Sequence, residues 1–370
     1  MEKSKVYFTS LRTSRKNNLL TKLKGLCIQA GMGEIDFKNK FTAIKIHFGE
    51  PGNLAYLRPN FAKVVADLVK ELGGKVFLTD CNTLYVGRRK EALEHMDAAY
   101  ENGYNPFMTG CQIIIGDGLK GADDVEVPVE GGEYIQTAKI GRAVMDADIL
   151  ISMTHFKGHE NTGFGGTLKN IGMGCGSRRG KMEMHSCGKP SVKEEKCTSC
   201  FACARICAFS AISYRESDKK AQIDHDLCVG CGRCIAVCPF DAIYPPFNES
   251  NDILNYKIAE YTKAVVAGRP QFHLSFVMDV SPDCDCHAEN DLPIIQDVGI
   301  FASFDPVALD MACADACNAS PIIKGSYLDE QENLSTDRFS RTHPKTNWKA
   351  CIDHGVKIKL GNDKYELIKV

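Results

Sequence analysis

Cysteines are the residues of this chain whose number and spacing most clearly indicate chemistry: 18 of its 370 residues are cysteine. Eight fall in two similar segments, "KCTSCFACARICAFSAISY" and "LCVGCGRCIAVCPFDAIYP", which both contain Cys-x-x-Cys-x-x-Cys-x-x-x-Cys. The first segment supplies Cys197, Cys200, Cys203 and Cys207, and the second supplies Cys228, Cys231, Cys234 and Cys238. Each cysteine of the second segment follows its counterpart by 31 residues, as Cys228 follows Cys197, so the region is an internal duplication.

This duplication resembles the bacterial two-cluster ferredoxin module over roughly residues 190–247. Three thiolates spaced two residues apart can surround one cubane, and in that module the fourth cysteine of each run binds the other cluster. We therefore expect two [4Fe–4S] clusters, one held by Cys197, Cys200, Cys203 and Cys238, and the other by Cys228, Cys231, Cys234 and Cys207. Zinc also accepts four thiolates, but two interleaved quartets with this triple spacing are not typical of zinc sites.

A second thiol site is suggested by "SPDCDCHAE", in which Cys284 and Cys286 lie one residue apart in an acidic, polar stretch. In an extended segment residues i and i+2 point the same way, so both thiols can reach one metal. Cys175, in the glycine-rich "GMGCGS", is the best third ligand, and the fourth candidates are His185, Cys187 and His287. A cubane held by three cysteines would leave one iron open as a Lewis acid. A redox-active thiol pair and unliganded thiols are the alternatives.

Candidate catalytic residues lie in "HFKGHENTGFGGTLKNIGMGC" and are His155, Lys157, His159 and Lys169. The two histidines are four residues apart and would share a helical face, although Gly158 makes a loop equally plausible. The glycines before Thr167 and Lys169 predict either an anion-binding helix start or a tight structural turn. Arg178, Arg179 and Lys181 form either a solvated basic face or a grip on an acidic substrate or redox partner.

The elements that must position these residues alternate between short apolar runs and amphipathic stretches. Runs such as "FTAIKIHF", "KVFLTD", "CQIIIGD", "ADILISMTH", "FHLSFVMDV", "PIIQDVGIFAS", "VKIKL" and "YELIKV" read as strands. Helical patterns lie between them, as in "RPNFAKVVADLVKELGG". This alternation predicts an α/β fold with a mostly parallel layered sheet. We expect a host domain in two parts, residues 1–189 and 248–370, with a small α+β ferredoxin-like module inserted at 190–247.

Ligands bind such sheets beyond the carboxyl ends of the strands, and polar residues follow several of the predicted strands. These are His47, Asp80, Asp117, His155, Asp279 and Asp305. Each is more often a turn or helix-cap residue, and Asp305 before Pro306 is a typical helix start. Cys313 and Cys317 share one helical stripe with Leu309, which predicts core packing. Several polar residues at one edge nevertheless favour a pocket there.

The composition limits the possible partners and the cellular setting. A formal net charge of -2 gives no reason to expect a nucleic acid or an anionic membrane as partner. The sequence has no run of about 18 apolar residues, which a spanning helix needs, and its start is too polar for a signal peptide. Many clustered thiols in a chain without an export signal predict metal ligands in a reducing compartment. We expect a cytoplasmic protein from an anaerobic setting.

Four segments together resemble the family known as domain of unknown function 362, described as uncharacterised iron–sulfur centre proteins. They are "GEPGNLAYLRP", "HFKGHENTGFGGTLKNIGMGC", "DVSPDCDCH" and "PIIQDVGIFASFDPVALDMA". The resemblance covers nearly the whole chain, and it implies an iron–sulfur protein that often carries an inserted ferredoxin module. It supplies no substrate.

These patterns predict an oxidoreductase of the ferredoxin type. Electrons would enter through the two clusters, exchanged with a redox partner protein, and reach a small-molecule substrate or a third metal site in the host domain. The sequence contains no dinucleotide-binding fingerprint, so it gives no support for NAD or flavin. One alternative is a non-enzymatic electron carrier or adaptor, which would need no closed pocket. The other is a protein that handles metals or clusters during maturation.

Overall fold

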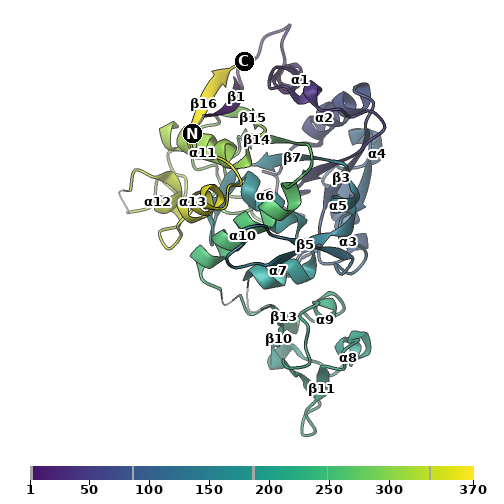
Figure 1. The fold of residues 1–370 in the computed structure, drawn as a ribbon. Helices are drawn as coiled ribbons and strands as arrows, with labels where there is room; N and C mark the ends of the chain where they lie inside the picture. Colours follow the sequence, from purple (N-terminus) through teal and green to yellow (C-terminus); the bar gives the residue numbers. More distant parts are fainter. Residues whose placement is uncertain (1–2, 86, 186–187, 248, 333–334) are drawn as a thin grey trace.

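The computed structural model describes residues 3–85, 87–185, 188–247, 249–332 and 335–370. Its largest feature is an eight-stranded sheet with the spatial order β16-β1-β15-β14-β7-β2-β3-β4 (Figure 1). The strand bounds are Ser4–Ser10 (β1), Phe41–Ile46 (β2), Lys75–Asp80 (β3), Gln112–Ile115 (β4), Ile149–His155 (β7), Gln271–Val277 (β14), Gly299–Ser303 (β15) and Tyr365–Lys369 (β16). Two hairpins lie outside this sheet, β5 (Asp124–Pro128) with β6 (Thr137–Gly141) and β8 (Lys157–His159) with β9 (Gly163–Gly165).

The sheet is mostly parallel, which confirms the fold expected of the host residues. Five of its ladders are parallel, and β15 alone runs against both of its neighbours, β1 and β14. The segment between β14 and β15, residues 278–298, contains no helix. A chain that returns without a crossover helix reaches its neighbour in the antiparallel sense, which explains the direction of β15.

Helices cover both faces of the sheet. One face packs against α1 (Leu19–Gln29), α2 (Pro59–Glu71), α3 (Ala92–Glu101) and α4 (Pro106–Thr109), with a short 3-10 turn at Met32–Glu34. The other face carries α5 (Arg142–Asp146), α6 (Thr167–Cys175), α7 (Arg178–His185), α10 (Asn251–Val266), α11 (Pro306–Ala319), α12 (Arg338–Thr342) and α13 (Lys349–Lys357). None of the described helices is long and apolar enough to pass through a bilayer.

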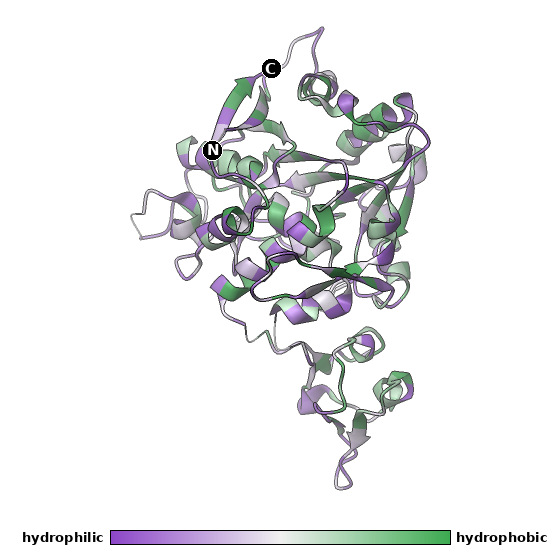
Figure 2. Cartoon of the chain, viewed as in Figure 1, coloured by the Kyte–Doolittle hydropathy of each residue, from purple (hydrophilic) through white to green (hydrophobic). Residues whose placement is uncertain are grey.

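Each face has its own hydrophobic core, and hydrophobic residues run along the central strands in Figure 2. The predicted start of α11 is confirmed, because the Asp305 carboxylate accepts hydrogen bonds from the N–H groups of Val307 (2.9 Å) and Ala308 (3.0 Å), with Pro306 in the first turn. Cys313 and Cys317 of this helix are fully buried, as expected.

The predicted strand "VKIKL" is wrong. Val356 and Lys357 complete α13, and Lys359 adopts a positive φ of 60° just after the helix ends. The residues before them bury one helical face, with Cys351 and Ile352 in the core. Helical packing upstream therefore overrides the local β preference of this short run.

Residues 188–247 form a separate lobe that projects from the body at the bottom of Figure 1. Its elements are β10 (Ser191–Val192), a 3-10 turn (Glu194–Lys196), α8 (Ala202–Ile206), β11 (Ile212–Tyr214), β12 (Ala221–Ile223), α9 (Arg233–Ala236) and β13 (Ile243–Tyr244). Strand β10 pairs with β13 and β11 pairs with β12, both antiparallel. The first and last strands of the lobe therefore meet where it joins the body.

The sequence duplication is also a structural one. Positive φ angles recur 31 residues apart, at Ser199 and Gly230, Phe201 and Gly232, and Ser210 and Asp241. Four of these six positions are not glycine, although residues with a Cβ seldom adopt this conformation. The two halves therefore fold their cysteine segments with the same backbone path.

Candidate functional site

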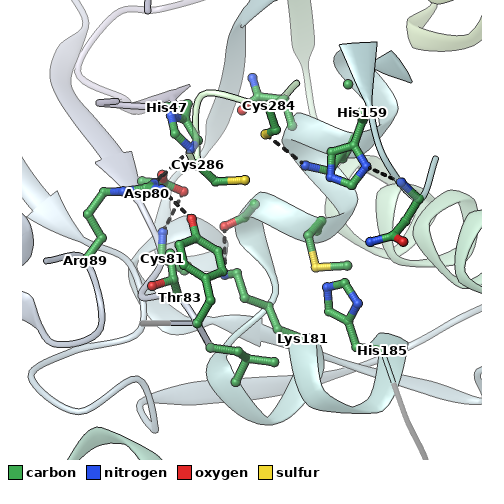
Figure 3. Close-up of a pocket in the computed structure, with 18 of the residues that line it drawn as sticks. His47, Asp80, Cys81, Thr83, Arg89, His159, Lys181, His185, Cys284 and Cys286 are labelled. Carbon is green, nitrogen blue, oxygen red and sulfur yellow. Dashed lines mark hydrogen bonds and ion pairs between the residues drawn. The ribbon is translucent and has the colours of Figure 1, made fainter. Parts of the chain in front are cut away.

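The main cavity of the described residues opens where β2, β3 and β7 end, at the carboxyl edge of the sheet. It encloses about 430 Å³ and lies among His47 after β2, Asp80 at the end of β3, the β8–β9 hairpin, α6, α7 and the 284–287 loop. Figure 3 shows His47, Asp80, Arg89, His159, Lys181, His185, Cys284 and Cys286 converging on this space. The size is that of a small-molecule site, and the pocket expected beyond the strand ends is present.

Positive charge dominates the wall of the cavity. Five cationic side chains line it: Lys45, Arg89, Lys157, Lys169 and Lys181. Three have carboxylate partners, in the pairs Lys45–Asp80 (3.0 Å), Arg89–Glu50 (2.8 Å) and Lys157–Asp285 (3.5 Å). Within the described residues, the Lys169 and Lys181 ammonium groups reach no carboxylate; Lys169 donates to the Cys284 sulfur (3.3 Å) and Lys181 to the carbonyl of Gly176 (2.5 Å). Because Lys169 faces the Cys284 sulfur, Lys181 is the ammonium group of this wall that reaches no negative partner in the described residues, and it favours an anionic ligand.

Cys284 and Cys286 meet in a tight turn rather than in the extended segment that was expected. The N–H of His287 donates to the carbonyl of Cys284 (2.9 Å), which closes the turn, and both cysteines line the cavity. The neighbouring Cys286 thiol, with the nearby Lys169 ammonium, lowers the pKa of Cys284 well below its ordinary value, whereas the pKa of Cys286 is raised by the same pairing.

His155 supports this turn from behind and is not among the residues that line the cavity. Its Nδ1 hydrogen-bonds the Asp285 carboxylate (2.8 Å) and its Nε2 the carbonyl of Met278 (2.9 Å). Asp285 is fully buried, and its backbone carbonyl accepts from the N–H of Glu50 (3.0 Å). The residue between the two cysteines is therefore fixed on both sides, and His155 acts by positioning that loop.

Lys157 and His159 lie on β8, so the shared helical face considered for His155 and His159 is not formed. Both line the cavity. Burial and the Lys169 charge lower the pKa of His159 to about 4. Backbone N–H groups of Asn161 (3.1 Å) and Thr162 (3.2 Å) donate to its Nδ1. The neutral ring therefore carries its proton on Nε2 and can donate it.

The expected anion site at the start of α6 is occupied by the protein itself. The first N–H groups of the helix, on Thr167 and Leu168, donate to the Asp310 carboxylate at 2.6 and 2.9 Å. A Cβ on Gly166 would lie 2.6 Å from that carboxylate, so the close approach requires glycine. Lys169, one turn further along, contributes to the cavity through its side chain instead.

The structure does not bring Cys175 to the cysteine pair. Cys175 ends α6, fully buried, and its carbonyl accepts from the Cys81 thiol. Six residues separate it from Lys169, or about 9 Å along a helix axis. His185 and His287 line the cavity, whereas Cys187 lies outside the described residues. In the part of the chain that is described, no three His, Cys, Asp or Glu residues are arranged to hold a metal ion.

The eight cysteines of the lobe line two small cavities. The first contains Cys197, Cys200, Cys203 and Cys238, and the second Cys207, Cys228, Cys231 and Cys234. Each crossing cysteine is held alike, because the N–H of Ala211 donates to the Cys207 sulfur and that of Ala242 to the Cys238 sulfur, both at 3.3 Å. Each hollow therefore gathers the four thiols expected of it, although the described residues include no group of three such side chains placed to hold a metal ion.

The lobe meets the body close to the main cavity. Leu84 lines that cavity and also packs into the core of the lobe beside its cysteines, together with Met182. The Lys90 ammonium donates to the carbonyl of Cys238 (3.2 Å) and pairs with Asp241 (2.5 Å). Arg178 is fully buried against Gly232, where an added Cβ would lie 2.7 Å from its side chain.

Several cavity residues had not been singled out from the sequence. Lys45 interrupts the apolar strand "FTAIKI" with a charge, and this was a usable signal because buried lysines require partners. Arg89 and Tyr85 lie in an irregular loop whose pattern gives no such signal. Of the basic trio in α7, Lys181 faces the cavity, Arg178 is buried at the lobe, and Arg179 pairs with Asp124 and Glu126.

Known proteins resemble this chain over different extents. The thylakoid-associated protein sll1697 of Synechocystis sp. is 28% identical over 131 residues, 34% of this chain and 35% of that protein, so the chain spans about a third of that relative's length. Among solved structures, the lactate racemase apoprotein of Thermoanaerobacterium thermosaccharolyticum is 12% identical and has a TM-score of 0.33. The matched region covers 74% of this chain and 51% of the racemase chain. A Thermotoga maritima protein is also 12% identical, with a TM-score of 0.42 and coverage of 81% and 57%. A family model, "Domain of unknown function (DUF362)", matches residues 42–315. This chain belongs to the DUF362 family.

Proposed function

We propose that this protein is an iron–sulfur oxidoreductase that reduces a small anionic molecule in the main cavity. The lobe would be a ferredoxin-type module inserted in the host domain, with Cys197, Cys200, Cys203 and Cys238 holding one [4Fe–4S] cluster and Cys228, Cys231, Cys234 and Cys207 the other. When bound, such clusters supply single electrons at low potential. A partner protein would load these electrons.

The observation that carries the proposal is the position of Leu84. This side chain packs beside the lobe's cysteines and also lines the main cavity. One residue thus belongs both to the buried cluster that contains lobe cysteines and to the lining of the proposed substrate cavity. A simple electron carrier would need neither the cavity nor its buried charges, so the arrangement favours an enzyme over the carrier or adaptor alternative.

The residues of the cavity have separate tasks in this proposal. Lys181 would bind a negative group of the substrate, since it reaches no carboxylate in the described residues, whereas Lys169 already balances the Cys284 sulfur. His159 would donate a hydrogen bond from Nε2 to the substrate, because its Nδ1 already accepts two backbone hydrogen bonds. Lys157 would keep the loop of Asp285 in place through its 3.5 Å ion pair.

The first test is the iron and acid-labile sulfide content of protein purified without oxygen. Two cubanes predict about eight irons per chain and two interacting EPR signals after reduction. Cys200→Ser should remove about half of the iron, whereas Cys27→Ala, in the core of the body, is the matched control and should leave it unchanged. Iron-free protein, or iron that Cys200→Ser does not alter, would contradict the proposal.

The second test concerns the substrate site. Reduced protein should be re-oxidised by small anionic acceptors faster than by cationic ones of similar size, followed by its visible absorbance. Lys181→Gln should slow the anionic reaction by about tenfold without loss of iron. Lys63→Gln, on the exposed side of α2, is the control. Equal rates for both acceptors would show that the cavity is not the site of reduction.

A further inference from the structure

The pair Cys284 and Cys286 lies apart from the cysteines of the lobe and is built differently from them. The two cysteines lie in one turn, closed by the hydrogen bond from the N–H of His287 to the carbonyl of Cys284 (2.9 Å), with only Asp285 between them. A disulfide needs Cα atoms about 4.4–6.8 Å apart, and a turn brings residues i and i+2 closer than an extended strand does. Both cysteines also face the cavity, where a reactant can reach them.

A third thiol in the same cavity provides an internal contrast. Cys81 also lines it, but its sulfur donates to the carbonyl of Cys175 (3.4 Å), and burial with the nearby Asp117 raises the pKa of Cys81 well above its ordinary value. Cys284 instead has the Lys169 ammonium 3.3 Å from its sulfur. Thiolates are the reactive form of cysteine, and adjacent lysines favour them. The surroundings in the cavity therefore favour the reactive thiolate form of Cys284 and keep Cys81 as an unreactive thiol.

The loop is also held firmly enough for repeated chemistry. Asp285 is buried and bound by His155 and Lys157, and the side-chain amide of Asn53 donates to the carbonyl of His287 (3.1 Å). The adjacent Gly52 approaches Ala288 so closely that an added Cβ would lie 3.1 Å from its carbonyl oxygen. A scaffold of this kind keeps two thiols in contact while the bonds between them change.

We propose that Cys284 and Cys286 form a redox-active dithiol that reduces a small disulfide carrying carboxylate groups. The inference rests on the proposed function only for the two electrons that restore the pair. The exchange with the disulfide needs no other redox group.

The reduction of the substrate takes place in two thiol–disulfide exchange steps. The Cys284 thiolate attacks one sulfur of the substrate disulfide, forming a mixed disulfide and releasing the first thiolate product. Cys286 loses its proton and attacks the Cys284 sulfur, which breaks the mixed disulfide and releases the second thiolate. The Cys286 proton and one proton from solvent convert both products to thiols. The resulting Cys284–Cys286 disulfide takes up two electrons and one proton to return to its starting state.

The charge of the cavity selects the substrate class. Attack by Cys284 places the substrate beside Lys169, and Lys181 stands free of carboxylate partners in the described part of the same wall. Both ammonium groups attract the carboxylates of the substrate, and they also stabilise the thiolate product as it leaves. A disulfide with amino groups in their place would meet like charges, which raise the free energy of the encounter.

The experiment that tests the pair is a thiol count under a defined redox buffer. Protein purified without oxygen is equilibrated in oxidised and reduced dithiothreitol, alkylated, and mapped by mass spectrometry. We expect the peptide with Cys284 and Cys286 to lose two alkylation sites reversibly and together. Cys284→Ser and Cys286→Ser should each abolish this, and Cys81→Ser should not. A pair that stays fully alkylated at every ratio would overturn the proposal.

Two probes of opposite charge test the substrate class. Dithiodiglycolate carries two carboxylates and cystamine two ammonium groups, and both are small disulfides. We expect dithiodiglycolate to oxidise the pair at least about tenfold faster, and Lys181→Gln to reduce this preference severalfold while the pair still forms its disulfide. Equal rates for the two probes would refute the anionic substrate.

Two further outcomes distinguish failure of this inference from failure of the proposed function. In the first, dithiodiglycolate oxidises the pair, whereas chemical reduction of the protein fails to restore the two thiols. This outcome would support the dithiol and contradict electron transfer from the proposed clusters. The opposite outcome has three signs: more than about eight irons per chain, less iron in Cys284→Ser, and a pair that resists alkylation until iron is removed. The two cysteines would then be metal ligands, and the dithiol proposal would be wrong.

Discussion

The body and the lobe of this protein bury their residues in different ways. In the body, two continuous hydrophobic cores fill the space between the sheet and the helices on its two faces. In the lobe, four of the ten residues of the buried cluster are cysteines, and two more, Leu84 and Met182, belong to the body. Large apolar side chains remain exposed on the lobe, among them Phe209 (49%) and Phe240 (45%). The lobe thus buries little apolar surface of its own, as small domains do when a metal site supports them.

If the lobe holds the proposed clusters, removal of their iron should separate the two regions most strongly. With a chelator under oxidising conditions, we expect residues 188–247 to lose nearly all amide protection in hydrogen exchange, because the cysteines would no longer be tied together. Amides of β2 and β7 should keep theirs, since packing holds the central strands. Hydrogen exchange with mass spectrometry before and after chelation measures both.

The result that contradicts this comparison is also clear. Protection of the lobe that survives complete loss of iron would mean that its backbone is stable without the clusters. Equal loss in body and lobe would mean that the two fold as one unit. Cys200→Ser offers a milder version, because it should affect the first cysteine-lined hollow before the second.

The sequence also predicted the lobe and the body to different extents. In the lobe, the resemblance to the two-cluster ferredoxin module predicted two quartets of cysteines with Cys207 and Cys238 exchanged, and the same quartets line the two hollows. That they bind clusters stays a prediction. In the body, period and caps predicted most strands, the α11 start and the buried Cys313 and Cys317. The direction of β15 was not predictable locally, since it depends on the missing crossover helix.

The candidate site was predicted only in part, for a related reason. Lys157, His159, Lys169, Cys284 and Cys286 were singled out and do line one cavity. Yet the sequence could not show that Asp310 caps α6, because 143 residues separate it from Thr167. Nor could it show that His155 turns toward Asp285. Contacts between distant segments decide which polar groups remain free for a ligand, and no local pattern records them.

The second test concerns the junction between the two regions, where we expect an effect of intermediate size on stability. Arg178 is buried where body and lobe meet, and its guanidinium donates to the carbonyls of Lys120 (3.2 Å) and Lys90. Arg178→Met would leave these buried carbonyls without donors, so we expect a loss of about 3 kcal/mol in the free energy of unfolding. Urea unfolding followed by fluorescence of Trp348, the single tryptophan, reports on the body.

The neighbouring arginine is the matched control. Arg179 pairs with Asp124 and Glu126 at 2.9 Å but is partly exposed, so Arg179→Gln should cost less than about 1 kcal/mol. If both variants lose the same small amount, the junction is not a structural support. In that case the lobe is attached mainly through its two chain connections.

The smallest effect concerns a buried charge inside the otherwise well-packed body. Burial raises the pKa of Asp310 from 3.8 to about 7, although the N–H groups of Thr167 and Leu168 oppose that shift. A carboxyl whose pKa is higher in the folded state stabilises that state fully below pH 4, and this contribution disappears as the pH rises through about 7. Between about pH 5.5 and 8.5, we expect the body to lose about 2 kcal/mol in the free energy of unfolding.

Asp310→Asn removes the titration and keeps one acceptor for the start of α6, so its free energy of unfolding should stay nearly constant over that range. The variant should therefore be less stable than the natural protein at pH 5.5, with the gap closing by pH 8.5. Asp315→Asn, on the exposed side of the same helix, controls for the loss of one charge. Parallel curves for Asp310→Asn and the natural protein would mean that the carboxylate stays ionised throughout and that its two N–H donors outweigh burial. The body would then stabilise even its buried charge by local hydrogen bonds, and dependence on a bound group would be confined to the lobe.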